Sequence, residues 1–431
     1  LQPAWHITDV MTHAYPAGPS RLSASMHAHR LYGLLPLVLL ALVSGCGLSQ
    51  QRSGSEPVSL RVATYNLALS EDHAGAISER LRGGEDLQAR RLAAVIQRVR
   101  PDVLLLNELD RDAAGENARL FIERYLAVAQ FGGEPIDFPY AFHAPVNTGV
   151  DSGLDLDGDG ALGGAGDAWG FGHHPGQYGM LVLSRFPMDM GGMRSFQTLR
   201  WADMPGALQP RLPEAEAPWY PPAIWAQLRL SSKSHWDLPI DTPLGRLHLL
   251  ASHPMPPAFD GPERRNVARN HDELRLWKDY LDGADWIRDD RGDTGGLQQG
   301  ARFVILGDLN ADPVEGDSLP GAIQQLLEHP RVLRAPAPQS EGSLEASLTF
   351  QPGNGAELAQ RGDPRTETAQ FSPRRGTMRV DYVLPSQGFQ VQDSGVFWPK
   401  RGAEGSDWVT ASDHRLVWVD LVHSPEADTA K

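Results

Sequence analysis

Short segments that are apolar throughout recur along this chain, and they constrain its fold more than any other feature. Residues 103–106 carry no polar side chain, and strands are also predicted at 180–184 and 303–307. Strands of this kind have to be covered on both faces. Between the first two, residues 87–99 place Leu92 and Ile96 on one helical face. The pattern predicts an α+β fold, a four-layer α/β/β/α sandwich of two packed mixed sheets with outer helices.

The same patterns predict the other elements and the domain organisation. Further strands are expected at 58–65, 224–230, 246–252, 380–384 and 415–421, and helices at 115–128, 262–280 and 319–328. Gly-, Pro- or Asp-rich stretches at 147–176, 198–222 and 331–378 are typical of inserts, which at such lengths are usually functional or disordered. We therefore expect one domain over 58–423 with long inserts, followed by a polar tail at 424–431.

The N-terminal region has the pattern of a secretory signal. The apolar run 31–43 is shorter than the roughly 20 residues that span a bilayer, and Cys46 follows small residues. This ending resembles a bacterial lipobox, in which a lipid is attached to the cysteine; a plain signal peptide with an incidental cysteine is the alternative. We expect 1–25 to lie outside the translated or folded protein, 26–45 to be the signal and 46–57 a tether. The resemblance implies an extracytoplasmic protein, anchored through its lipid to the membrane of the cell envelope.

Composition limits the classes of partner. The formal net charge of the chain is −15, which argues against a large non-specific nucleic-acid surface. It does not exclude one, because charge acts in patches. Cys46 is the only cysteine, so no internal disulfide can form. The sequence indicates no protein partner.

Polar residues recur where the predicted strands end. They are Asn66, Glu108, His253, Asp308, Asn310, Asp381, Asp413 and His414. A single residue of this kind is more often a turn or a cap. A series in which each follows or lies in an apolar run predicts side chains that converge on one shared site.

Here the sequence resembles a known family. The motifs TYN at 64–66, NE at 107–108, GDLN at 307–310, RVDYV at 379–383 and SDH at 412–414 resemble those of the endonuclease/exonuclease/phosphatase superfamily. That family includes deoxyribonucleases, inositol-polyphosphate 5-phosphatases and secreted sphingomyelinases. The resemblance covers nearly all of the chain after the tether. It implies metal-dependent hydrolysis of phosphate esters.

The resemblance also implies a metal site. Glu108 would bind a divalent cation, Mg²⁺ (or Mn²⁺), because hard oxygen ligands and a phosphate substrate favour these ions. Asn66 and Asp413 would complete or support that site. The cation offsets the negative charge of the phosphate before another oxygen attacks it. Asn107 departs from the pattern, since many nucleases of the family have Gln before the metal-binding Glu.

The remaining residues would act on water and phosphate. Asp308 would orient or deprotonate the attacking water, and Asn310 would hold that water or a phosphate oxygen. His414 would contact the phosphoryl oxygens or the nucleophile, with Asp381 fixing its tautomer. His253 would bind the phosphate or protonate the leaving oxygen, and the sequence indicates no acidic partner for it. Which residue is the general base stays open.

An acidic loop within the first insert is a separate candidate. Asp155, Asp157 and Asp159 have the spacing at which a calcium loop of the EF-hand type begins. The twelfth position is Gly166 instead of Glu, and Asp167 comes one residue late. The loop is therefore either a Ca²⁺ site or a flexible acidic loop.

Two further features have alternative interpretations. Lys233, His235 and Trp236 are expected at the surface, with a position facing the phosphate as the alternative. Trp201, Trp219 and Trp225 are expected either to pack in the core or to stack on a ring of the substrate.

The sequence favours a hydrolase of small or lipid-linked phosphate esters. The alternatives are a nuclease acting on extracellular DNA or RNA and, in another class, a non-catalytic surface lipoprotein that uses the fold as a binding module. A zinc hydrolase of another fold is disfavoured, because no His-rich ligand motif is present.

Overall fold

The computed structural model describes residues 58–214, 217–348, 360–371 and 376–424. The predicted signal peptide, the tether and Cys46 therefore lie outside the described residues, as does most of the tail. Contacts within the chain separate Val58–Lys431 from the preceding segment. Within the described part of the chain, no helix combines the length and the apolar character needed to cross a membrane.

Six strands form the first sheet. Its order is β14-β15-β1-β2-β4-β3, and β1 and β2 are parallel whereas the other neighbours are antiparallel. The strands are β1 (Leu60–Leu69), β2 (Val103–Leu109), β3 (Tyr140–Phe142), β4 (Met180–Ser184), β14 (Phe389–Val396) and β15 (Val417–His423).

The second sheet has five strands in the order β13-β10-β9-β8-β5. Here β9 and β10 are the parallel pair. The strands are β5 (Arg194–Ser195), β8 (His235–Thr242), β9 (Gly245–Ser252), β10 (Phe303–Asp308) and β13 (Asp381–Pro385). Short hairpins β6 (Arg211–Leu212) with β7 (Ala217–Pro218) and β11 (Ala369–Gln370) with β12 (Thr377–Met378) lie outside both sheets.

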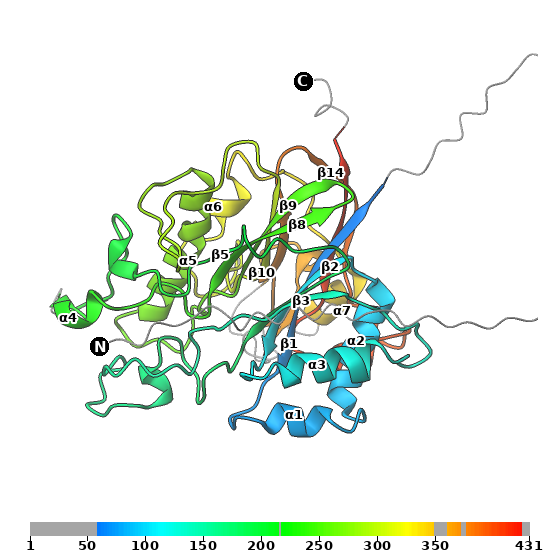
Figure 1. Ribbon diagram of the computed structural model, residues 1–431, viewed down its shortest axis with the longest axis horizontal. Helices are drawn as coiled ribbons and strands as arrows, with labels where there is room; N and C mark the ends of the chain where they lie inside the picture. Colours follow the sequence, from blue (N-terminus) through cyan, green and yellow to red (C-terminus); the bar gives the residue numbers. More distant parts are fainter. Residues whose placement is uncertain (1–57, 215–216, 349–359, 372–375, 425–431) are drawn as a thin grey trace, which may run out of the picture. The chain divides into compact units, whose positions relative to one another are not determined.

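Three apolar cores define the layers. Val62 of β1 and Val304 of β10 belong to one buried cluster, which fills the space between the sheets. The neighbouring residue Ala63 belongs to a second cluster with α2, and Ile305 belongs to a third with α5. Because alternate residues of a strand point to opposite faces, each sheet is covered on both sides. The predicted α/β/β/α sandwich is confirmed, and Figure 1 shows α2 and α3 beside β1 and β2 with α5 near β5 and β10.

The helices are short apart from two. They are α1 (Ala76–Leu81), α2 (Leu87–Val99), α3 (Glu116–Phe121), α4 (Pro222–Trp225), α5 (Arg265–Leu281), α6 (Gln324–Leu327) and α7 (Glu341–Ser347). Single helical turns of other types are η1 (Ile122–Leu126), η2 (Ala165–Asp167), η3 (Trp201–Asp203), η4 (Pro364–Thr366) and η5 (Trp408–Ala411).

The structure corrects several of the predicted elements. The strand expected at 224–230 is wrong, because Pro222 begins the helical turn α4 and turns follow it. The helix expected at 319–328 is reduced to α6. The helix expected at 115–128 passes from α3 into the π-helical turn η1. Strand β8 was missed, because Asp237 and Pro239 interrupt its apolar pattern.

Burial also decides the two open interpretations. Lys233, His235 and Trp236 are buried, so their predicted surface exposure is wrong. Trp201 lies in the core beneath the second sheet, where its indole nitrogen donates to Asp272, and Trp225 packs against that core. Trp219 also packs against this core, so core packing accounts for all three tryptophans.

Candidate active site

The ends of four strands bring the predicted residues together. Asn66 and Asn107 are paired in β1 and β2, and Asp308 and Asp381 are paired in β10 and β13. The two sheets are joined at this end, because the side-chain oxygen of Asn107 accepts the backbone N–H of Asp308 at 3.1 Å. Asn107, which departs from the family pattern, thus holds the strand end that carries Asp308.

The carboxylate of Asp308 lies at the centre of the site. Asn66 donates to its Oδ2 from Nδ2 at 3.0 Å. The same oxygen lies 3.4 Å from His253 Nε2 and 3.7 Å from His414 Nε2. Burial favours the neutral acid, but the adjacent His414 and His253 outweigh burial and lower the pKa of Asp308. Asp308 is also the acidic neighbour of His253 that was not evident in the sequence.

His414 and Asp381 form a buried pair. The Nδ1 atom of His414 lies 2.9 Å from Asp381 Oδ2, and the backbone N–H of His414 donates to the Ser412 hydroxyl. Burial would lower the pKa of His414, but the carboxylates of Asp381 and Asp308 raise it well above its usual value. Burial raises the pKa of Asp381 to about 6. At neutral pH, His414 is therefore a cation held between two carboxylates.

The pKa of His253 is shifted in the opposite direction to that of His414. Burial, reinforced by the positive charge of Lys233, lowers its pKa. Its Nδ1 is buried without a hydrogen-bond partner, so the ring proton belongs on Nε2, which faces Asp308. The two histidines beside Asp308 therefore differ in charge, one neutral and the other protonated.

Glu108 offers an accessible carboxylate beside this cluster. Its Oε1 lies 3.7 Å from His253 Nε2, and ligand atoms of Glu108, His253 and Asp308 all lie within 4.8 Å of one another. The side chain of Glu108 is 25% exposed, whereas the other two are buried. Its backbone has φ 57°, a left-handed conformation that costs a Glu of order 1–3 kcal/mol and is characteristic of functional sites. The two carboxylates in this arrangement fit a divalent cation, while the Nε2–H of His253 is directed at Asp308.

The remaining predicted residues occupy the margin of the site. Asn310 also has a left-handed backbone, with φ 53°, and its side chain donates to the Pro254 carbonyl at 3.1 Å. Asp413 is half exposed, and its Oδ1 lies 4.0 Å from His414 Nε2. Among the described acidic and histidine groups, the cluster around Glu108 does not include Asp413. Its role as a metal ligand stays a prediction, as does that of Asn66, whose amide is engaged by Asp308.

The site also uses two buried charged residues: Lys233, for which a position facing the phosphate was the alternative interpretation, and Glu273, which sequence analysis did not assign to the site. Lys233 interacts electrostatically with the carboxylates of Glu108 and Asp308, and burial lowers its pKa. Glu273 on α5 accepts the backbone N–H groups of Ser232 and Met255, both at 2.6 Å. It therefore ties the segment before Lys233 to the segment after His253. The available signal was an acidic residue on the face of α5 that buries Trp277.

The acidic loop of the first insert has a different membership from the predicted one. Asp155 and Asp157 are grouped with the buried Asp167, whereas Asp159 is outside this group. The backbone N–H of Leu156 donates to Asp167 at 2.7 Å, which folds the loop back on itself. The loop's Ca²⁺ binding stays a prediction.

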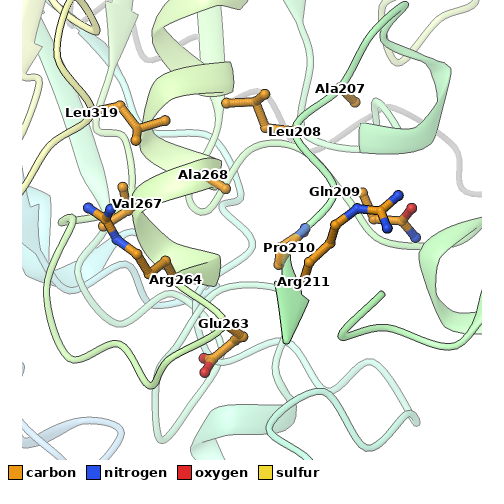
Figure 2. A pocket seen from close by; sticks show the side chains of 10 residues that line it. All are labelled: Ala207, Leu208, Gln209, Pro210, Arg211, Glu263, Arg264, Val267, Ala268 and Leu319. Atoms are coloured by element: carbon orange, nitrogen blue, oxygen red, sulfur yellow. The ribbon is translucent and has the colours of Figure 1, made fainter. Parts of the chain in front are cut away.

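A separate pocket lies away from these residues. It has a volume of about 430 Å³ and is lined by residues 207–211, the region of Glu263–Ala268 and Leu319. Figure 2 shows Arg211 and Arg264 on its two sides, with Leu208 between them. None of the predicted site residues lines it, and it holds no carboxylate–histidine pair.

Comparison with known proteins extends these observations. The model of the Endonuclease/Exonuclease/phosphatase family matches residues 63–414, a span that contains every predicted residue of the site. No curated protein matches the sequence.

Solved structures give remote similarities. An endonuclease/exonuclease/phosphatase from Beutenbergia cavernae is 22% identical over 85% of this chain and 72% of its own, with a TM-score of 0.46. Sphingomyelinase C from Streptomyces griseocarneus is 16% identical over 84% of this chain and 99% of its own, with a TM-score of 0.42. The human Nocturnin catalytic domain is 14% identical over 85% of this chain and 95% of its own, with a TM-score of 0.39. These similarities leave the substrate open.

Proposed function

Since the chain belongs to the Endonuclease/Exonuclease/phosphatase family, we propose that it hydrolyses phosphate esters at the site centred on Asp308, with a divalent cation bound beside Glu108. The observation that carries the proposal is the carboxylate of Asp308 between two histidines, one neutral and the other protonated. Attack of water on a phosphate requires a base, a proton donor and a positive charge. The cluster supplies them as the ionised Asp308, the neutral His253 and the protonated His414.

The proposed reaction moves one proton through the cluster. Water attacks phosphorus, the ester P–O bond breaks, and the proton of the water passes to Asp308. His253 gives its Nε2 proton to the leaving oxygen and takes the proton from Asp308, which lies 3.4 Å away. The protonated His414 lies beside the phosphoryl oxygens and offsets their charge.

Positive charge in the site comes from the chain itself and from the cation. Lys233 adds a buried ammonium group beside Glu108 and Asp308. A divalent cation bound at Glu108, with Mg²⁺ or Mn²⁺ as our proposal, would withdraw charge from the phosphate. Asn66 keeps Asp308 in place by its hydrogen bond to Oδ2.

We propose a small or lipid-linked phosphate ester as the substrate. The net charge of −15 disfavours a long polyanion, because binding DNA depends on many phosphate contacts with Lys and Arg. A panel of phosphomonoesters, phosphodiesters, phospholipids and DNA, each with Mg²⁺, Mn²⁺ or Ca²⁺, tests this proposal. Hydrolysis of a small or lipid ester is the expected result. Preferred cleavage of DNA would contradict the substrate, and no hydrolysis of any ester would contradict the activity.

We further propose that the protein is lipid-anchored outside the cytoplasm. The proposal depends on Cys46 after the apolar run, both outside the described residues. Cys46→Ser should move the protein from the membrane fraction to the soluble extracytoplasmic fraction and abolish labelling by a fatty-acid analogue. Equal membrane partitioning of the variant and the wild type would count against the anchor.

A further inference from the structure

A second cluster of buried carboxylates lies outside the candidate active site. Asp312 and Glu315 belong to the segment after β10, and Glu367 lies in the third insert, just before β11. All three are buried, and one ligand oxygen of each lies within 4.8 Å of the others. None of the residues named in the proposed reaction belongs to this cluster.

The charges of this cluster have no ion-pair partner in the described part of the chain, although Arg379 interacts electrostatically with Glu367 and Gln360 Nε2 donates to Glu367 Oε1 at 2.8 Å. No Lys, Arg or His there lies within ion-pair distance of Asp312, Glu315 or Glu367. Glu367 is 1% exposed, and its Oε2 has no hydrogen-bond partner. An unpartnered buried carboxylate oxygen that faces two other carboxylates is costly unless a cation or a proton neutralises it.

The surrounding backbone shapes the cluster around its free oxygens. The backbone N–H groups of Arg361 and Gly362 donate to Glu315 Oε1, and that of Arg379 donates to Asp312 Oδ2. Oε2 of Glu315 lies so near Gly362 that a Cβ there would approach it to 3.0 Å. Backbone amides from two segments therefore hold Glu315 and Asp312, and one oxygen of each lies within 4.8 Å of an oxygen of Glu367.

We propose that Asp312, Glu315 and Glu367 form a structural divalent-cation site. Ca²⁺ is the ion that the donors favour, because all are carboxylate oxygens in loops of irregular geometry. Two oxygens that bind one Ca²⁺ at about 2.4 Å can be at most about 4.8 Å apart, and one oxygen of each residue lies within that limit of the others. The ion joins the third insert to the segment that follows Asp308.

The proposed ion lies next to a segment that supports the backbone of the active site. Thr368, next to Glu367, accepts the backbone N–H groups of Val380 and Asp381 at its hydroxyl, each at 3.0 Å. The strand of the insert also pairs with the active-site segment through the bridge of Ala369 to His414. The site thus fixes the backbone on which the Asp381–His414 pair is built, so Glu367 is a positioning residue.

Binding of Ca²⁺ to the chelator-stripped full chain tests the proposal. We expect Ca²⁺ to raise the thermal midpoint of the wild type by about 5 °C. Glu367→Gln and Glu315→Gln should each lose this shift and one Ca²⁺ per chain in equilibrium dialysis. Two variants are used so that, if one of them does not fold, the other still tests whether the cluster binds Ca²⁺.

Two controls separate this site from the others. Glu108→Gln alters the proposed catalytic metal site and Asp155→Asn alters the acidic loop, and both should keep the Ca²⁺-dependent shift. The proposal is overturned if Glu367→Gln and Glu315→Gln bind and respond to Ca²⁺ like the wild type. It is also overturned if the wild type shows no response, since protons then neutralise the cluster. Because the readout is stability, its failure would leave the proposed hydrolysis unaffected.

Discussion

Two groups of buried carboxylates begin four residues apart in the sequence and differ in what balances their charge. Asp308 ends β10 and has histidines on both sides, whereas Asp312 faces Glu315 and Glu367. The neighbouring His414 and His253 lower the pKa of Asp308 against the effect of burial. Burial without such partners raises the pKa of Glu367 to about 9.

This difference separates a site that transfers protons from a site at which we propose that an ion has a structural role only. Next to histidines, a buried carboxylate remains ionised and can exchange protons with them. Next to other carboxylates, it requires an added positive charge or a proton. Sequence proximity is therefore a poor guide to role, because the partners come from distant strands and inserts.

The largest effect is expected from breaking the Asp381–His414 pair. Asp381→Asn and His414→Ala should each lower kcat by about 10³-fold, because either change removes the protonated imidazole beside Asp308. Since the two residues act as one unit, the double variant should be little worse than the worse single variant. Steady-state kinetics on the best ester of the substrate panel measures the cycle.

One result of this double-mutant cycle would contradict the proposed pairing of Asp381 with His414. If the losses of the two single variants multiply in the double variant, the residues act separately and the role given to Asp381 is wrong. Glu367→Gln, assayed with the same ester, should lower kcat less than either change in the pair. An equal loss would mean that the second cluster takes part in the chemistry directly.

A smaller effect is expected from Lys233. Lys233→Met removes the buried ammonium group beside Glu108 and Asp308, and should lower kcat/KM by about 10²-fold. Lys278→Met is the matched control, because Lys278 is partly exposed and pairs with Asp282 on α5. If Lys233→Met is as active as Lys278→Met, Lys233 has no part in catalysis and its role is structural.

The smallest effect is a pH dependence. The pKa of Asp381 is raised to about 6, so this carboxylate gains a proton as the pH falls through 6, and the charged His414 loses the negative partner that holds its ring in place. We expect kcat to fall about tenfold between pH 6 and pH 5. Asp381→Asn should lack this acidic limb, whereas Glu367→Gln should retain it. A limb near pH 6 that persists in Asp381→Asn would assign it to another group.

The sequence predicted the sandwich and the strand ends well because both depend on local patterns. The apolar run of β2 and the helical periodicity of Leu87–Val99 appear in the structure at nearly the predicted bounds. The pairing of Asp381 with His414, implied by the family resemblance, also agrees with the distance of 2.9 Å.

What the sequence did not predict depends on contacts between distant segments. Lys233 was expected at the surface, because nothing in its own segment indicates that it is buried. Glu273 is more than 15 residues from either segment that it holds. Glu367 lies within an insert whose composition resembles that of a loop. In each case the partner that gives the residue its role comes from elsewhere in the chain.

The dependence of hydrolysis on Mg²⁺ concentration, measured for the wild type and Glu108→Gln, tests the central claim most directly. The change removes one negative charge next to His253 and Asp308 and leaves the size of the side chain nearly unchanged. We predict that the wild type is inactive in EDTA and recovers with Mg²⁺ or Mn²⁺, while Glu108→Gln stays at least about 10²-fold less active at saturating metal. Full activity of the wild type in EDTA, or of Glu108→Gln at the metal concentration that the wild type requires, would contradict the account.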